Sequence, residues 1–165
     1  PELGRLMYQI ACAMNARNIV EFGSSFGISA IYLAAAARKN DGRFTGTEML
    51  PHKHQVAESN LVSAGLKRWA DIREGDAMES LAPLDGPVDF VFLDGWKELY
   101  IPILQLLEPK LSDGAIIVAD NINSFRKTLK PFVDHVSDPC NGYETTVIPL
   151  GSGVSISTWS GQTAT

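Results

Sequence analysis

The chain has 165 residues, of which 45% are hydrophobic and 20% charged, a composition typical of a globular domain. Its formal net charge of -5 argues against a nucleic-acid backbone as the main partner, because that partner requires a basic face. The longest uninterrupted apolar stretch, residues 30–37, is far too short to cross a bilayer, so no membrane partner is expected.

The first residues and the two cysteines indicate the compartment. Residues 1–5 have neither the basic flank nor the apolar core of a signal peptide. Cys12 and Cys140 are far apart and form no C-x-x-C motif, which is typical of reduced thiols in a cytoplasmic protein. Because the sequence starts at Pro1 rather than Met, we expect that it was processed or is a fragment.

The hydrophobic pattern predicts alternating helices and strands along the chain. An amphipathic helix over residues 2–15 precedes five strand–helix pairs, at 18–22 and 28–39, 43–48 and 51–64, 70–74 and 77–81, 88–93 and 99–107, and 115–119 and 124–136. Segments 143–150 and 154–159 flank Gly151-Ser152-Gly153 and predict a hairpin. The order predicts an α/β fold in a single domain over residues 1–165. Its sheet is expected to be doubly wound, Rossmann-like and mostly parallel, with an antiparallel C-terminal hairpin.

Two of the predicted apolar strands end in oxygen-bearing side chains. Asp94 follows the fourth strand, and Asp120 and Asn121 follow the fifth. Ligands collect at the carboxyl ends of parallel strands, so these side chains are candidate ligands for Mg²⁺, Ca²⁺ or Mn²⁺, with Lys97 as a candidate base. The alternatives are a turn or helix cap for Asp120-Asn121 and a surface position for Lys97.

A glycine turn between the first strand and its helix predicts a cofactor site. The pattern Glu21-x-Gly23-x-x-x-Gly27 is neither the dinucleotide fingerprint nor the phosphate loop, so it does not require a phosphate. Glu48 ends the second strand, where a carboxylate can accept both ribose hydroxyls. An adenosine-bearing cofactor with a cationic centre, S-adenosylmethionine, fits both features, and the adenine would rest at the end of the third strand, on Gly75, Asp76 and Ala77. The alternative is a plain strand-to-helix turn with a capping Glu21 and a solvated Glu48.

The same segments carry a family resemblance that extends from about Gly4 to Trp159. Its specific pieces are V-E-F-G at 20–23 with Gly27 and Ser29, F-L-D-G-W-K-E-L-Y at 92–100, and A-D-N at 119–121. They resemble the cation-dependent class I S-adenosylmethionine O-methyltransferase family, and within it the chain is most similar to the catechol O-methyltransferases.

The resemblance implies a role for each matching residue. Asp94, Asp120 and Asn121 match the divalent-metal ligands, Lys97 matches the general base, and Trp96 matches an aromatic residue that borders the cofactor and the substrate ring. The positions that match the lining of the S-adenosylmethionine site are Glu21, Gly23, Ser25, Ser29, Glu48, Ala77 and Asp94. The implied reaction transfers a methyl group to a hydroxyl of a small acceptor, such as a vicinal-diol aromatic.

The chain departs from the family pattern in two places. Animal catechol O-methyltransferases have a C-terminal glutamate that holds the second catechol hydroxyl, whereas L-G-S-G-V at 150–154 contains no acid. The reaction type is therefore implied without the identity of the acceptor. The family also commonly has more N-terminal helices over the active site. Without them the substrate pocket would be unusually open, or a partner subunit, as in a homodimer, would complete it.

Two other functions remain open at this point. A metal-independent methyltransferase acting on another small nucleophile would use the strand-end carboxylates for the cofactor alone. A non-catalytic adenosine-binding or dimerisation module would keep the fold without the reaction.

Overall fold

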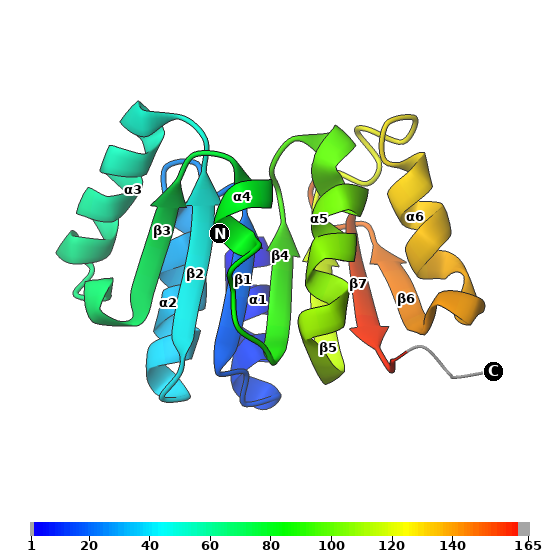
Figure 1. The fold of residues 1–165 in the computed structure, drawn as a ribbon, viewed down its shortest axis with the longest axis horizontal. Coiled ribbons are helices and arrows are strands. Elements are labelled where there is room, and N and C mark those ends of the chain that lie inside the picture. The colour runs from blue at the N-terminus through cyan, green and yellow to red at the C-terminus, as the bar shows by residue number, and fades with distance from the viewer. Residues whose placement is uncertain (1, 162–165) are drawn as a thin grey trace.

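The computed structural model describes residues 2–161, which form a seven-stranded sheet with helices on both faces (Figure 1). The strand order is β3-β2-β1-β4-β5-β7-β6, and the first five strands are parallel while β7 runs antiparallel to both of its neighbours. The strands are β1 (Asn18–Phe22), β2 (Arg43–Glu48), β3 (Ala70–Glu74), β4 (Val88–Leu93), β5 (Leu111–Ala119), β6 (Tyr143–Ile148) and β7 (Val154–Trp159). The predicted fold class is confirmed.

Three helices cover each face of the sheet, and the side chains of each group pack against the sheet in a separate hydrophobic cluster. The helices are α1 (Glu2–Ala13), α2 (Ile28–Lys39), α3 (Pro51–Ser63), α4 (Ala77–Leu81), α5 (Tyr100–Leu107) and α6 (Lys130–Ser137). Side chains of α1, α2 and α3 share one cluster with the sheet, and those of α4, α5 and α6 share the other. The central strands are therefore buried on both faces, which explains why β1 and β4 read as nearly continuous apolar runs.

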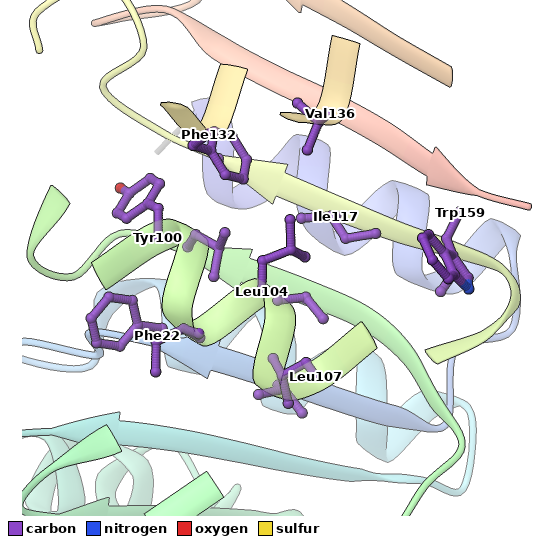
Figure 2. Packing of buried hydrophobic residues seen from close by; sticks show 14 of the residues in the cluster. Phe22, Tyr100, Leu104, Leu107, Ile117, Phe132, Val136 and Trp159 are labelled. Atoms are coloured by element: carbon purple, nitrogen blue, oxygen red, sulfur yellow. The ribbon is translucent and has the colours of Figure 1, made fainter. Parts of the chain in front are cut away.

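The second of these clusters packs between the sheet and α4, α5 and α6, and Figure 2 shows part of it. The Tyr100 ring lies between those of Phe22 and Phe132, with centroids 6.4 Å and 5.6 Å away, and both pairs meet edge to face. Leu104 and Leu107, on the buried face of α5, are fully buried in the same cluster. The first residue of α5 is therefore fixed by packing before any polar contact is considered.

The largest correction to the predicted boundaries concerns α6. A helix was expected over 124–136, but residues 122–129 form turns and α6 begins at Lys130. Pro131 lies in the first helical turn, where its missing N–H costs no intrahelical bond, whereas farther inside a helix it would break one. The residues that follow Asn121 are consequently a loop beside the candidate site.

The strand β5 is longer than expected, because it starts at Leu111 rather than at residue 115. Ser112-Asp113-Gly114, near the start of this longer strand, forms a bulge where the register against β4 shifts. The Ser112 hydroxyl donates to Asp89 Oδ1 at 3.0 Å and so ties the bulge to β4. Smaller corrections shorten the first helix to Ala13, α3 to Ser63 and β6 to Ile148.

Within the described part of the chain, no helix has both the length and the apolar character needed to cross a membrane.

Replacing Leu104 by Ala should destabilise the protein by about 2–5 kcal/mol, because the fully buried side chain would leave a cavity under α5. Urea unfolding followed by circular dichroism measures the change. Val62→Ala, at an exposed position on α3, is the matched control and should stay within about 0.5 kcal/mol of the parent. Equal effects at the two positions would contradict the assignment of this core.

Candidate active site

The loops that follow the parallel strands are linked by backbone hydrogen bonds that extend the strand pairing past the carboxyl ends of the strands. Asp94 N donates to Phe22 O at 2.9 Å, and Asp120 N donates to Leu93 O at 3.1 Å. On the other side, Gly75 N donates to Glu48 O at 2.9 Å. The segments after β1, β2, β3, β4 and β5 thus meet at one edge of the sheet, as the sequence predicted for a parallel arrangement.

The glycine turn after β1 packs directly against the backbone after β4. Gly23 has φ +91°, and a Cβ placed on it would lie 2.5 Å from the Cα of Gly95. A side chain would therefore force the two loops apart, in addition to the strain of the left-handed backbone. This close approach places the predicted cofactor turn beside the predicted metal ligands.

A pocket of about 260 Å³ opens between these loops. Eight of the predicted cofactor residues line it, namely Gly23, Ser25, Glu48, Gly75, Asp76, Ala77, Asp94 and Trp96. Sequence reasoning missed the other seven lining residues, which are Phe22, Thr47, Met49, Leu50, Lys53, Gly95 and Leu99. Most of these directly precede or follow a predicted strand-end residue, so extending each motif by a few positions would have found them.

Glu48 links two of the segments that line the pocket. Its Oε2 accepts from Ser25 N and its Oε1 from Leu50 N, both at 2.8 Å, so one carboxylate fixes the glycine turn and the start of α3. Each oxygen keeps a second lone pair, which leaves the carboxylate able to accept hydroxyls from a ligand. Asp76 likewise combines two roles. It lines the pocket, and its Oδ1 caps α4 by accepting from Met78 N at 2.8 Å.

Glu21, Gly27 and Ser29 do not line the pocket, although the sequence placed them in the cofactor site. A Cβ on Gly27 would meet Ala57 Cα at 3.0 Å, so this glycine lets α2 and α3 pack closely behind the turn. Glu21 is fully buried under the turn, where its Oε2 accepts from the Ser24 hydroxyl at 2.5 Å. Gly27 and Glu21 therefore support the turn from outside the pocket, and Ser29 lies beside Glu21.

Burial raises the pKa of Glu21 from an ordinary 4.5 to about 7. The hydroxyls of Ser24 and Ser29 oppose that rise, and the neighbouring charges of Asp94 and Glu48 add to it. Among the described residues, Glu21 Oε1 has no hydrogen-bond partner. An ionised Glu21 is thus costly in the protein as it stands, and a cation in the adjoining pocket would lower that cost.

The three candidate metal ligands come together as predicted. Asn121 Nδ2 donates to Asp94 Oδ1 at 2.7 Å, and the backbone of Asn121 is held with φ +69° by its own N–H bonding Asp120 Oδ1 at 2.6 Å. Burial raises the pKa of Asp94, and the nearby charge of Asp120 adds to the rise. Two carboxylates and one amide are hard oxygen donors of the type that Mg²⁺ and Ca²⁺ prefer. A half-turn of the Asn121 amide would present its oxygen, so the set fits such an ion.

Histidine and cysteine take no part in this cluster. Within residues 2–161, no three His, Cys, Asp or Glu side chains converge on a common point, so the candidate set depends on the amide of Asn121. His54 instead contacts Glu74, with Nδ1 3.1 Å from Oε2, at the outer strand β3.

Lys97 reaches into the same cluster. Its Nζ lies 3.2 Å from Asp94 Oδ1, 3.0 Å from Gly95 O and 3.0 Å from the Tyr100 hydroxyl. The side chain is only 13% exposed, in contrast with the surface position that is usual for lysine. Trp96, the residue before Lys97, is 61% exposed and borders the pocket, which leaves its ring accessible to a ligand.

Comparison with known proteins agrees with this arrangement. A family model described as a methyltransferase domain matches residues 20–122. Catechol O-methyltransferase from Niastella koreensis is 36% identical over 126 residues, covering 74% of this chain and 57% of the relative. Catechol O-methyltransferase from Mycobacterium tuberculosis is 35% identical over 120 residues, covering 72% and 54%. The family model covers more than half of the sequence, and the chain therefore belongs to the class I O-methyltransferases.

Solved structures share the fold over almost the whole chain. The crystal structure of cofactor-bound Rv0187 from MTB is 26% identical with a TM-score of 0.89, and the match covers 97% of this chain and 80% of that one. An O-methyltransferase from Bacillus cereus in complex with SAH has a TM-score of 0.85 over 96% of this chain and 81% of its own, at 22% identity. The chain spans only about half the length of the two curated relatives, so their activity is a proposal for it.

Replacing Glu21 by Gln should flatten the pH dependence of stability. The folded state binds the Glu21 proton more tightly than the unfolded chain does, so stability is full below pH 4.5 and falls as pH rises towards 7. Over this range the free energy of unfolding of the parent should fall by on the order of 3 kcal/mol. The Glu21→Gln variant has no carboxyl at this position, so it should not lose this stability and should be more stable than the parent at pH 8.

Urea unfolding at several values between pH 4.5 and 8 measures this difference. The exposed Glu2→Gln change in α1 is the control, and it should leave the parental pH dependence intact. A Glu21→Gln protein whose stability followed pH as steeply as the parent would show that the buried carboxyl is not the source.

Proposed function

We propose that the chain transfers a methyl group from S-adenosylmethionine to a hydroxyl of a small acceptor, with the help of a divalent metal ion. The observation that carries the proposal is the shared position of Asp94. It lines the pocket and also bonds Asn121 and Lys97, so the candidate cofactor site and the candidate metal site adjoin. A vicinal-diol aromatic acceptor is the class that fits such an ion, because two adjacent hydroxyls can coordinate it together.

The charges of the pocket favour a cationic cofactor. Glu48, Asp76 and Asp94 line it together with a single lysine, Lys53. Glu48 would accept the ribose hydroxyls with its free lone pairs, and Gly75 to Ala77 would receive the adenine. S-adenosylmethionine, when bound, supplies the methyl group and leaves as S-adenosylhomocysteine.

The other side of Asp94 would hold the metal ion and the acceptor. Asp94, Asp120 and Asn121 supply the oxygen ligands, and Trp96 borders the space between them and the pocket. A divalent cation, when bound, lowers the pKa of a coordinated hydroxyl, which is otherwise near 10 for a phenol, and fixes its orientation.

Lys97, as the neutral amine, would take the proton of the reacting hydroxyl and become an ammonium as the new oxygen–carbon bond forms and the sulfur–carbon bond breaks. Its Nζ lies within the ligand cluster, 3.2 Å from Asp94 Oδ1, so it is placed beside the acceptor rather than beside the adenosine end of the pocket. Alignment of the hydroxyl with the methyl group supplies much of the expected acceleration. Two of the relatives are named catechol O-methyltransferases, which supports a hydroxyl as the methyl acceptor.

One observation favours a metal-independent reaction as the second candidate. The Asp94 carboxylate already accepts from Asn121 Nδ2 at 2.7 Å and from Lys97 Nζ at 3.2 Å, so this chain partly satisfies it without a cation. A methyltransferase acting on another small nucleophile would use these contacts only to shape the cofactor pocket.

The decisive test follows S-adenosylhomocysteine formation with catechol, caffeoyl and flavonoid acceptors. We expect turnover that stops on adding EDTA and returns with Mg²⁺, because the ion orients and acidifies the acceptor. Isothermal titration with S-adenosylmethionine alone serves as the control for an intact cofactor site. Turnover that is indifferent to EDTA would support the metal-independent reaction, and failure to bind S-adenosylmethionine would sink both.

Replacing Lys97 by Met should lower kcat by at least about 100-fold, because general-base catalysis typically contributes a factor of 10² to 10⁴. The affinity for S-adenosylmethionine should change little, since Lys97 is not among the lining residues of the pocket. Lys127→Met, at an exposed position in the loop after Asn121, is the matched control and should keep parental kinetics. Unchanged kcat in the Lys97 variant would remove this residue from the mechanism.

A further inference from the structure

As an ammonium, Lys97 has three N–H groups for the three acceptors that surround it, and as the neutral amine that can take a proton it has two N–H groups and one lone pair. The three acceptors are Asp94 Oδ1 at 3.2 Å, Gly95 O at 3.0 Å and the Tyr100 hydroxyl at 3.0 Å. The aromatic ring of Phe125, in the loop after Asn121, lies 5.7 Å from Nζ. The amine is therefore held from several directions.

The three acceptors around Lys97 differ in the other contacts that they make. Asp94 also accepts from Asn121 at 2.7 Å and is a candidate metal ligand, so its bond to Nζ competes with other contacts. Gly95 contributes only its backbone carbonyl, and that backbone is fixed against Gly23. Tyr100 is the remaining partner, and it is a side chain to which the proposed reaction assigns no other task.

The Tyr100 hydroxyl is held in one orientation. Its single hydrogen is donated to Asp120 O at 3.2 Å, which leaves the oxygen lone pairs to accept from Lys97 Nζ. The ring is fully buried, and its edge-to-face contacts with Phe22 and Phe132 fix its position (Figure 2). The hydroxyl is a fixed acceptor at the end of a rigid side chain.

We infer that Tyr100 is a positioning residue for Lys97. Its hydroxyl and Gly95 O accept the two N–H groups of the neutral amine, so that the lone pair, in the third direction towards Asp94, faces the place where the acceptor hydroxyl would lie. This inference rests on the proposed function, because it gives Lys97 an acceptor to face. Tyr100 itself touches neither cofactor nor acceptor and acts through the lysine.

Tyr100→Phe removes the hydroxyl and keeps the ring. We expect kcat to fall by about 10- to 100-fold, the usual effect of losing one hydrogen bond to a charged group. The acceptor KM and the S-adenosylmethionine affinity should stay within about twofold. Tyr143→Phe makes the same chemical change at a buried tyrosine whose hydroxyl bonds Glu108 Oε1 at 2.8 Å, and its kcat should remain parental.

Two further measurements separate positioning from a structural effect on Asp120. If the lost bond to Asp120 O were responsible, the Mg²⁺ concentration for half-maximal activity would rise, whereas positioning of Lys97 leaves it unchanged. In a Lys97→Met background, Tyr100→Phe should cause no further loss of kcat, because its effect passes through the lysine. Losses that multiply in the double variant would overturn the inference.

A readout that does not need turnover distinguishes failure of this inference from failure of the proposed function. With ¹³Cε-labelled lysine, NMR should show two distinct methylene proton shifts for Lys97 in the parent, assigned by their absence from Lys97→Met. These shifts should merge in Tyr100→Phe, as the amine gains freedom, and stay distinct in Tyr143→Phe. Merged shifts already in the parent would overturn the inference, whereas an inactive parent with distinct shifts would refute only the proposed function.

Discussion

The candidate site depends on the contact between two backbones, that of Gly23 after β1 and that of Gly95 after β4. No side chain fits between them, since a Cβ on Gly23 would lie 2.5 Å from Gly95 Cα and a Cβ on Gly95 would meet the Phe22 ring at 2.5 Å. The bond from Asp94 N to Phe22 O extends the β1–β4 pairing into the same region. Because the loops cannot separate, Asp94 lies at once in the pocket wall and among the candidate metal ligands.

This close packing concentrates negative charge at one edge of the sheet. Glu21 and Glu48 lie beneath and beside the glycine turn, and Asp94 and Asp120 follow the next strands. Burial raises the pKa of Glu21 and of Asp94, so ionising either carboxylate costs free energy in the folded protein. Such local cost is characteristic of functional sites, where stability is traded for a preorganised electrostatic field. Both proposed ligands are cations, and either would offset part of this cost.

Sequence reasoning predicted the strand ends well and the connections poorly. Asp94 and Asn121 were predictable because buried parallel strands are continuous apolar runs, and the residue after each run must reach the same edge. The start of α6 was not, because the pattern over 124–136 is helical and only Pro131 and tertiary packing decide where the helix begins. The position of Glu21 behind the turn, rather than in the pocket, depends on which way one side chain points at a strand end. The pairing of Lys97 with Tyr100 depends on how the ring packs in the core, which no local pattern specifies.

Tyr100 shows how the core and the chemistry are connected. Its ring belongs to the cluster under α5 and α6, while its hydroxyl bonds Lys97 Nζ and Asp120 O. Packing of α5 on the sheet therefore sets the position of the candidate base, and no loop has to do so.

The exposed aromatic side chains near the candidate site are held less tightly. Trp96 and Phe125 are 61% and 46% exposed and lie on segments without regular strand or long-helix structure. In the proposed reaction, the buried contacts would define the geometry, whereas these exposed rings would be free to adapt to an acceptor. Under the proposed function, the acceptor would therefore depend on these exposed residues, which is why Asp94 and Lys97 predict a type of chemistry without predicting its substrate.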